Sequence, residues 1–335
     1  MMIGKILNWT GSVLVLLSLA GCCSRPVAYG PKTFNSEGLT AIVVAYAPEM
    51  IGVEAIIESL PSASITEHMS IRGVRYGLGE YNGEPVIVFA TGMSIANAAM
   101  SMQMAFDYFP IKQVVYMGIA GAVNEELLPG DVVVPERWYY HDESVYVNPD
   151  PNEPGEYIEP DYYQAFLDDQ ENRRKEDPNT PMYKPFGFIH PDEVVVIKEG
   201  MEKPQDEAYF TASPRLLDAA RAAVADLPTP NVVEEREVIY KVGGNGVTGS
   251  VFMDNREYRK WMREVWTAEV TEMESAAVAQ VCYVNDVDWI IIRAVSDLAG
   301  GQEGKNVENH YDVEASLVGA KVLFALLDEI LSKED

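Results

Sequence analysis

Side chains that can bind and exchange protons stand at or near the carboxyl ends of several short apolar runs. They are Glu49, Thr91, Arg293, Ser296 and Asp297. If the runs are parallel strands, their carboxyl ends meet at one sheet edge, and these carboxylates, hydroxyls and guanidinium would share a crevice. Any single carboxylate among the 52 acidic residues is more often solvated or a helix cap, so the prediction depends on this convergence.

A second group of candidates lies nearer the end of the chain. Glu272 and Glu274 precede a predicted helix, Ser275 to Tyr283, where carboxylates are favourable beside the positive helix end. A carboxylate at this junction could also accept two hydrogen bonds from a diol. Phe252 and Met253 could form a flat apolar wall for an aromatic ring, although such a pair is more often part of the core.

The elements that would position these side chains are short β-branched runs that alternate with Ala- and Met-rich helical patterns. Predicted strands are Ala41 to Ala45, Pro85 to Ala90, Gln113 to Met117, Asp131 to Val134 and Trp289 to Val295, and predicted helices are Ser94 to Phe109, Ser275 to Tyr283 and Ser316 to Leu331. This alternation predicts an α/β fold, a three-layer α/β/α sandwich with a central, largely parallel sheet. Segments 47–49, 91–94, 118–121 and 296–297 would then follow strands directly.

Two segments interrupt the alternation. From about residue 149 to 205, nine prolines and many acidic residues break the periodicity, but frequent aromatic residues predict a packed insertion rather than a disordered loop. Gly244 to Gly249 matches G-x-G-x-x-G between a strand-like and a helix-like segment, as a dinucleotide loop would. A lone match is weak, and Glu264, the candidate ribose ligand, would lie inside a helix, so a dinucleotide site remains a minor alternative.

Length and composition limit the class of protein. A chain of 335 residues with 47% hydrophobic residues can bury a full-sized core, and its apolar runs favour one continuous domain over residues 39–335. The net charge of −27 opposes binding to a nucleic-acid backbone. The four His lack ligand spacing and no paired-Cys motif is present, so we expect neither a metal nor another cofactor.

The first residues have the layout of a secretory signal, with Lys5, an apolar run from Val13 to Ala20 and a small-residue cleavage site. Leu19 to Cys22 looks like the lipobox of a bacterial lipoprotein. Residues 1–21 are therefore predicted to be a signal peptide, Cys22 a lipid anchor and 22–38 a tether, which would place the domain on the outer side of the cytoplasmic membrane. A plain signal peptide or a short membrane-apposed helix is the alternative.

Several motifs together carry a family resemblance. They are Ala47–Glu49, Thr91–Met93, Gly118–Gly121, Pro129–Val134, Tyr140–Asp142, Ser250–Asn255, Glu272–Ala277 and Arg293–Gly301. From Leu39 to the end, the chain resembles the nucleoside phosphorylase and nucleosidase superfamily, most closely 5'-methylthioadenosine/S-adenosylhomocysteine nucleosidases and the plant bark and vegetative storage proteins. The resemblance implies a small purine nucleoside as the ligand and a homo-oligomer, commonly a dimer.

The resemblance also implies roles for the acidic residues. Asp297 would be the general acid that protonates purine N7, Glu49 would hold or activate the attacking water, and Glu274 would accept the ribose hydroxyls. Arg293 would orient Glu49 and the water, and Ser296 would support Asp297. Breaking the N-ribosidic bond leaves positive charge on the sugar and negative charge on the base, which such a distribution stabilises.

The same resemblance implies roles for four other residues. Thr91 would line the ribose or nucleophile pocket and Met273 would pack on the sugar. Phe252 would stack on the purine while the Met253 backbone reads its edge.

Two alternatives stay open at this point. Related phosphorylases use phosphate instead of water and carry an Arg before the glycine turn, where this chain has Tyr116 and Met117. Glu49 would repel a phosphate dianion, so hydrolysis is favoured. The resemblance to storage proteins keeps a non-catalytic nucleoside-binding lipoprotein as the other alternative, because fold alone does not fix function.

Overall fold

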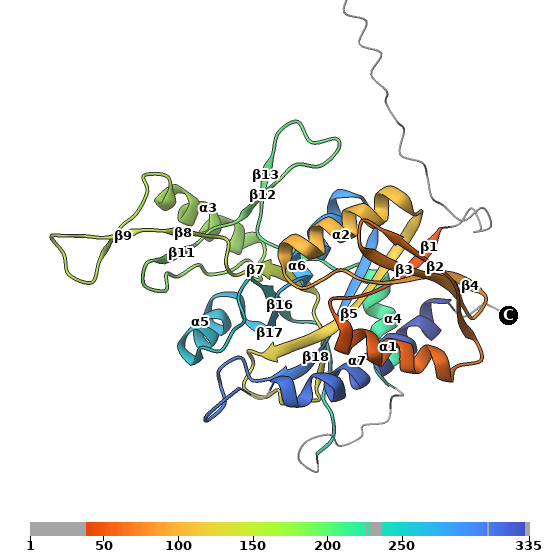
Figure 1. Cartoon of the computed structure of the whole chain (residues 1–335). Coiled ribbons are helices and arrows are strands. Elements are labelled where there is room, and N and C mark those ends of the chain that lie inside the picture. The colour runs from red at the N-terminus through yellow and green to blue at the C-terminus, as the bar shows by residue number, and fades with distance from the viewer. Residues whose placement is uncertain (1–37, 226, 228–235, 307, 332–335) are drawn as a thin grey trace, which may run out of the picture.

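The computed structural model describes residues 38–225, 227, 236–306 and 308–331 (Figure 1). In chain order the elements are β1 (Leu39–Val44), α1 (Ala47–Ser59), β2 (Ala63–Ile71), β3 (Val74–Tyr81), β4 (Glu84–Ala90), α2 (Ile95–Tyr108), β5 (Ile111–Ala122), β6 (Val132–Val134), β7 (Arg137–Tyr140), β8 (Ser144–Tyr146), β9 (Asn148–Pro149), β10 (Tyr157–Ile158), α3 (Tyr163–Glu176), β11 (Ile189–Pro191), β12 (Val194–Val196), β13 (Gln205–Glu207), β14 (Phe210–Thr211), α4 (Pro214–Ala225), β15 (Tyr240–Val242), β16 (Asn245–Thr248), α5 (Arg256–Trp266), β17 (Ala268–Glu272), α6 (Ser275–Val284), β18 (Asp288–Asp297) and α7 (Glu308–Leu331). The predicted signal peptide, the anchor Cys22 and nearly all of the tether lie outside the described residues.

Twelve strands of the described chain form one mixed sheet. Its centre is parallel: β1 lies between β4 and β5, and β18 pairs with the other edge of β5. Every residue of β1 is buried, as expected for a parallel strand covered on both faces. The hairpin β2–β3 extends the sheet beyond β4, and β17, β16, β7 and β14 extend it beyond the end of β5.

Helices cover both faces of this sheet, which confirms the predicted three-layer fold. Helices α2 and α6 pack together on one face, while α7 packs against β5 and β18 and contacts α1 and α4 on the other (Figure 1). The predicted strands and helices are all present. The last helix begins at Glu308, earlier than the predicted Ser316, and its turns from Ser316 onward bury the apolar side chains against the core.

The structure corrects one prediction about strand ends and excludes the minor alternative for one loop. Segments 118–121 and 296–297 do not follow strands but belong to β5 and β18, because β18 stays paired with β5 as far as Gly121. Segment 244–249 is not a dinucleotide loop. Residues Asn245–Thr248 form β16, whose backbone pairs with β7 on one side and β17 on the other, so its amides are not free to cradle a phosphate.

The predicted insertion is folded. It occupies part of the segment between β7 and β14, which contains α3 and three small strand pairs and extends from the sheet beside α5 (Figure 1). Phe166 stacks on Tyr183 with a centroid distance of 5.5 Å, and Phe186 packs against Tyr258 and Trp261 of α5. These aromatic contacts explain why a segment rich in Pro and acidic residues is packed.

The apolar side chains of the described residues pack into two clusters. The larger lies between the sheet and its helices, and the smaller surrounds Trp261 and Trp266 beneath the insertion. Cys282 is buried in the larger cluster as a free thiol. None of the helices in the described ranges combines the length and the apolar character of a membrane span.

Candidate active site

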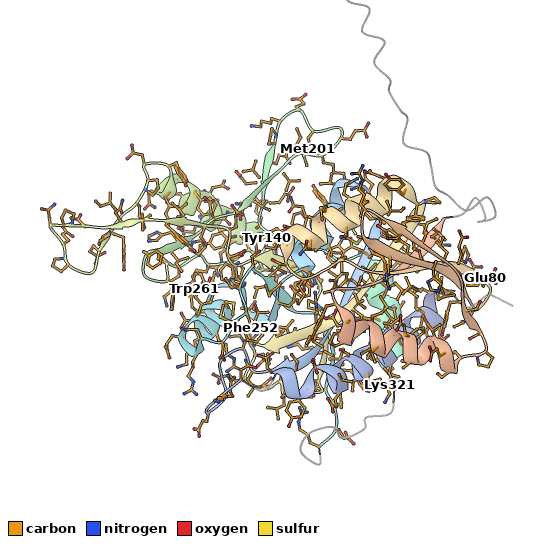
Figure 2. All side chains as sticks on the ribbon, viewed as in Figure 1. Glu80, Tyr140, Met201, Phe252, Trp261 and Lys321 are labelled. Atoms are coloured by element: carbon orange, nitrogen blue, oxygen red, sulfur yellow. The ribbon has the colours of Figure 1, made fainter. Side chains whose placement is uncertain are left out.

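A cavity opens where β5 and β18 approach their carboxyl ends. Its lining residues are Ala45, Tyr46, Glu49, Met93, Ile119, Ala120, Gly121, Val251, Phe252, Met253, Thr271, Glu272, Met273, Glu274, Ser296 and Asp297. Figure 2 shows Phe252 between α5 and the tip of β5 in this view. Segments far apart in the sequence thus meet at one sheet edge, as predicted for the carboxyl ends of neighbouring strands.

Glu49 is held at the start of α1, where Pro48 suits the first helical turn. One carboxylate oxygen accepts the backbone N–H of Ala45 at 2.6 Å, and the other accepts the N–H of Ile119 at 2.9 Å. The residue is 1% exposed, and burial raises its pKa, against the opposing effects of Arg293 and the backbone N–H donors. A buried carboxylate with a raised pKa and fixed orientation is suited to accept a proton.

Arg293 is fully buried and binds several groups at once. Its strongest contact is an ion pair with Glu272, and it also donates to Ser275 Oγ at 2.8 Å and to the carbonyl of Ile119 at 3.1 Å. Its separation from Glu49 Oε1 is larger, at 3.9 Å. Arg293 therefore touches the group that it was predicted to orient, but its principal partner is Glu272.

Glu272 has a structural role that the sequence indicated only in part. Its carboxylate accepts the backbone N–H groups of Glu274 and Ser275, both at 2.9 Å, and so caps α6. It also accepts a hydrogen bond from the Thr248 hydroxyl and forms an ion pair with Arg293. The expected favourable position beside the positive helix end thus describes Glu272 well, but its pairing with Arg293 has no signal in local sequence.

Glu274 faces the cavity one residue before α6. It accepts the backbone N–H of Ser94 at 2.7 Å, and Ser94 has a φ of 80° at the start of α2. Burial, then the nearby charge of Glu272, raises the pKa of Glu274. Met273, the residue before it, also lines the cavity, so this turn offers a carboxylate and a thioether on the same side.

Asp297 also lines the cavity. It is 3% exposed, and burial raises the pKa of its carboxyl group. Ser296 donates to Oδ2 at 2.9 Å, and the backbone N–H of Ala299 donates to Oδ1 at 2.8 Å. A raised pKa favours the protonated carboxyl group, which is the form that a general acid requires.

Two predicted residues form an apolar part of the cavity lining. Phe252 is 59% exposed although it lines the cavity, so it does not belong to the core and its ring is available to a ligand. Met253 also lines the cavity and packs against the smaller apolar cluster. Together they present an apolar surface suitable for a planar ring.

Thr91 does not line the cavity, contrary to its predicted place. It is 4% exposed, and its hydroxyl contacts the carbonyl of Gly92 at 3.0 Å and the hydroxyl of Tyr116 at 3.3 Å, behind the cavity wall. The strand β4 ends one residue earlier, so the backbone turns at Gly92 and carries the hydroxyl inwards. Of the other predicted residues, Arg293 also lies beneath the lining rather than in it.

The close packing of Arg293 and Glu49 against β5 depends on a glycine in that strand. Gly118 lies opposite Arg293 in the β5–β18 pairing, and a Cβ placed on it would lie 2.1 Å from Arg293 Nη1 and 2.6 Å from Glu49 Oε1. No other residue type fits there without moving these groups. Within the described ranges, no group of three or more His, Cys, Asp or Glu side chains is arranged to hold a metal ion.

Sequence comparisons agree with this geometry. A family model described as the phosphorylase superfamily matches residues 40–332. A 5'-methylthioadenosine/S-adenosylhomocysteine nucleosidase of Mycobacterium bovis is 26% identical over 261 residues, which cover 78% of this chain and 88% of that protein. The enzyme of the same name from Shewanella denitrificans is 27% identical over 290 residues, covering 86% and 98%.

Solved structures show the same fold. The futalosine hydrolase of Helicobacter pylori superposes with a TM-score of 0.61 at 18% identity, covering 87% of this chain and 98% of that chain. A methylthioadenosine/S-adenosylhomocysteine nucleosidase from Colwellia psychrerythraea, in complex with adenine, gives 0.61 at 22% identity, covering 89% and 97%. With the family model spanning nearly all of the described chain, the protein belongs to the phosphorylase superfamily.

Proposed function

We propose that this chain hydrolyses the N-glycosidic bond of a purine nucleoside and releases free base and free sugar. The observation that carries the proposal is that one cavity holds an Asp with a raised pKa, an exposed aromatic ring and buried glutamates. Relatives named as nucleosidases over most of the chain support the same reaction.

The proposed reaction uses these groups together. The purine stacks on Phe252, and the proton of Asp297 passes to N7 as the C1'–N9 bond breaks, so the base leaves as a neutral molecule. Positive charge develops on the sugar, where the carboxylates of Glu49 and Glu274 stabilise it. Water adds to C1' and gives its proton to Glu49, which completes the hydrolysis.

The other predicted residues support this reaction. Ser296 holds the Asp297 carboxyl group, Met273 contacts the sugar, and the Met253 backbone contacts the edge of the base. Glu274 receives hydrogen bonds from the ribose hydroxyls. Arg293 fixes the glutamates from below, because its guanidinium contacts Glu49, Glu272 and Glu274 without lining the cavity.

The charge of the cavity favours water over phosphate as the nucleophile. Four carboxylates line it, namely Glu49, Glu272, Glu274 and Asp297. Arg293, the cation beneath them, already pairs with carboxylates and is fully buried. A phosphate dianion would lack a free cationic donor and would meet repulsion from the glutamates.

Two features favour a 5'-thio-substituted adenine nucleoside as the substrate. Met93, Met273 and Val251 line the cavity and offer apolar and sulfur contacts to a thioether. Relatives named for methylthioadenosine and S-adenosylhomocysteine share most of their length with this chain. The acidic composition of the chain and the expected envelope location are also compatible with a scavenged nucleoside of the same class as the substrate.

We further propose that Cys22 carries a lipid that holds the domain in a bacterial cell envelope, on the periplasmic or extracellular side, and that the domain forms a homo-oligomer. Labelling cells with a fatty-acid probe should mark the wild-type protein and not Cys22→Ser. Light scattering of the soluble domain should give the mass of a dimer, and a monomeric mass would refute that assignment.

Product analysis tests the reaction directly. The chain from Ser24 onward keeps every described residue and both apolar clusters. It would be incubated with methylthioadenosine, S-adenosylhomocysteine, adenosine and inosine, with and without phosphate, and the products separated by chromatography. Free base and free sugar without phosphate are expected. Sugar 1-phosphate formed only with phosphate would show a phosphorylase instead.

A matched variant separates catalysis from binding. Asp297→Asn removes the transferable proton but keeps the size of the side chain, so turnover should be abolished while ligand affinity stays within about tenfold. Undiminished turnover by this variant would refute the role of Asp297. Binding without turnover by the wild-type protein would instead support the storage-like alternative, which the exposed Phe252 wall would also allow.

A further inference from the structure

The loop that follows Asp297 folds back over it. Ala299 and Gly300 have φ angles of 49° and 87°, which turn the chain sharply after β18. A Cβ on Gly300 would lie 2.4 Å from the backbone N of Asn255, so the turn packs closely against the start of α5. This path brings Asn306, which is not a lining residue of the cavity, within hydrogen-bond distance of Asp297.

Asn306 bridges two carboxylates. Its Nδ2 atom lies 3.3 Å from Asp297 Oδ1 and 3.3 Å from Asp254 Oδ1. Asp254 is anchored in turn by Gln302, whose amide donates to the same Oδ1 at 2.6 Å. Arg256 holds the carbonyl of Gln302 at 2.9 Å. The loop and the start of α5 thus form one hydrogen-bonded unit around the amide.

The bridge makes the two oxygens of Asp297 unequal. Oδ1 accepts both the backbone N–H of Ala299 and the amide of Asn306, whereas Oδ2 contacts only the hydroxyl of Ser296 among the hydrogen bonds of the described residues. Two N–H donors occupy the lone pairs of Oδ1 and disfavour a proton there. A hydroxyl can turn to accept a hydrogen bond, so Oδ2 is the oxygen that can carry the proton.

We propose that Asn306 and Asp254 are positioning residues that control the protonation of Asp297. Asn306 keeps the proton on Oδ2 and favours its release, while the negative charge of Asp254 opposes the loss of that proton. The two effects have opposite signs, and their balance sets the pH range in which Asp297 remains an acid. The catalytic use of that acid rests on the proposed function, but its ionisation is a property of the free protein.

Other charged groups around Asp297 are left unchanged in the test. Arg256 and Glu125 act on Arg259, which itself interacts with Asp297, and Glu49, Glu272 and Glu274 line the same cavity. Arg259 is the group among them whose charge interacts with Asp297 directly. It is held by the carbonyl of Ala122 at 2.8 Å, so it should keep its place when the bridge is altered.

The test measures the ionisation of Asp297 by NMR in protein labelled at the Asp carboxyl carbons, with Asp297→Asn identifying the signal. Asn306→Leu removes a donor to the carboxylate and should raise the apparent pKa of Asp297 by about 0.5 to 1 pH unit. Asp254→Asn removes a negative charge but keeps an acceptor for Asn306 and Gln302. It should lower the pKa by a similar amount.

A charge control comes from the same loop. Glu303 is exposed, so Glu303→Gln removes one negative charge without a contact to the bridge and should leave the pKa within about 0.2 unit. General loosening of the loop would move both bridge variants in one direction. Shifts of the same sign, or none, would overturn the proposal.

A kinetic measurement connects the bridge to the reaction. In the pH profile of kcat/KM, the pKa of the alkaline limb should rise in Asn306→Leu and fall in Asp254→Asn, in parallel with the NMR values. Absence of turnover in the wild-type protein would refute the proposed function, while the NMR titration would still decide whether the bridge controls Asp297. Turnover with an unmoved limb would overturn the link between bridge and catalysis.

Discussion

Replacing Gly118 by alanine should disable the site through a single added methyl group. The new Cβ would lie 2.1 Å from Arg293 Nη1 and 2.6 Å from Glu49 Oε1, well inside van der Waals contact. The obstruction lies on both sides of the methyl group, because Arg293 is held by Glu272 and Ser275 while Glu49 is held by backbone N–H donors. One of the two side chains must therefore leave its partners.

The size of the effect follows from these contacts. Overpacking of a buried site costs about 1 to 3 kcal/mol, and weakening a buried ion pair adds to that cost. We expect the free energy of unfolding to fall by about 2 to 4 kcal/mol. Displacing a catalytic carboxylate by about 1 Å lowers rates roughly 100-fold, so kcat/KM should fall by about that factor or more. Urea unfolding measures the free energy of unfolding, and product formation under single-turnover conditions measures the rate of the reaction separately.

A matched glycine separates crowding in general from crowding at this site. A Cβ on Gly319 of α7 would lie 3.0 Å from Met117 Sδ and 3.3 Å from Ala294 Cβ, two residues that do not line the cavity, and a Met side chain can yield. Gly319→Ala should therefore change stability by less than about 1 kcal/mol and leave kcat/KM unchanged. If Gly118→Ala keeps wild-type stability and turnover, the fixed positions of Arg293 and Glu49 are not required and the reasoning fails.

Three further outcomes follow from the buried charges and the buried thiol. Arg293→Met leaves the Glu272 carboxylate buried without its cation and should cost about 3 to 5 kcal/mol in urea unfolding. Burial raises the pKa of Glu49 and Glu274, which Arg293 also contacts, so the loss should be smaller at pH 5 than at pH 8 because these two groups can then take up protons. An equal loss at both pH values would contradict this explanation. In the insertion, burial raises the pKa of Glu193 from 4.5 to about 7 against the opposing charge of Arg173, so the folded state binds more protons than the unfolded state between these values. Stability should fall by roughly 2 to 3 kcal/mol as pH rises from about 4.5 to 7 and then level off, and Glu193→Gln should flatten that slope when unfolding is measured across the range. Burial also raises the pKa of the Cys282 thiol, so the chain from Ser24 onward should react with a thiol reagent many times more slowly when folded than in urea, and equal rates would show that the helix α6 opens readily.

The parts of the fold that the sequence predicted are those where burial is complete. All of β1 is buried, as is β18 after its first residue, so each reads as a largely apolar run, although Thr40 interrupts β1 and Arg293 interrupts β18. The hairpin β2–β3 was not predicted, because most of β2 is exposed or half-buried and its sequence carries a His and a Glu. Helix α1 was missed for a related reason. Only Glu49, Gly52 and Val53 of its residues are buried, which leaves no apolar stripe at helical spacing.

The site was predictable to the extent that sheet topology brings strand ends together. That rule placed Glu49, Ser296 and Asp297 at one edge before any side chain was located, whereas Glu274 was predicted from its helix junction and the family resemblance. It does not give the direction of a side chain where the backbone turns, and Thr91 was therefore expected in the cavity although its hydroxyl points behind the wall.

Pairings between distant residues lie further beyond the reach of sequence patterns. Glu272 is a good helix-capping residue by local rules, and those rules are satisfied, yet the same carboxylate also binds Arg293 from another strand. Both functions are met by one group because β17 runs antiparallel to β5 and delivers Glu272 beside the β5–β18 pair. The one local signal of this crowded arrangement is Gly118, a glycine inside a buried strand. A glycine inside a strand weakens that strand, so its presence indicates that another group occupies the space of the missing side chain. In this protein that group is the Arg293 guanidinium.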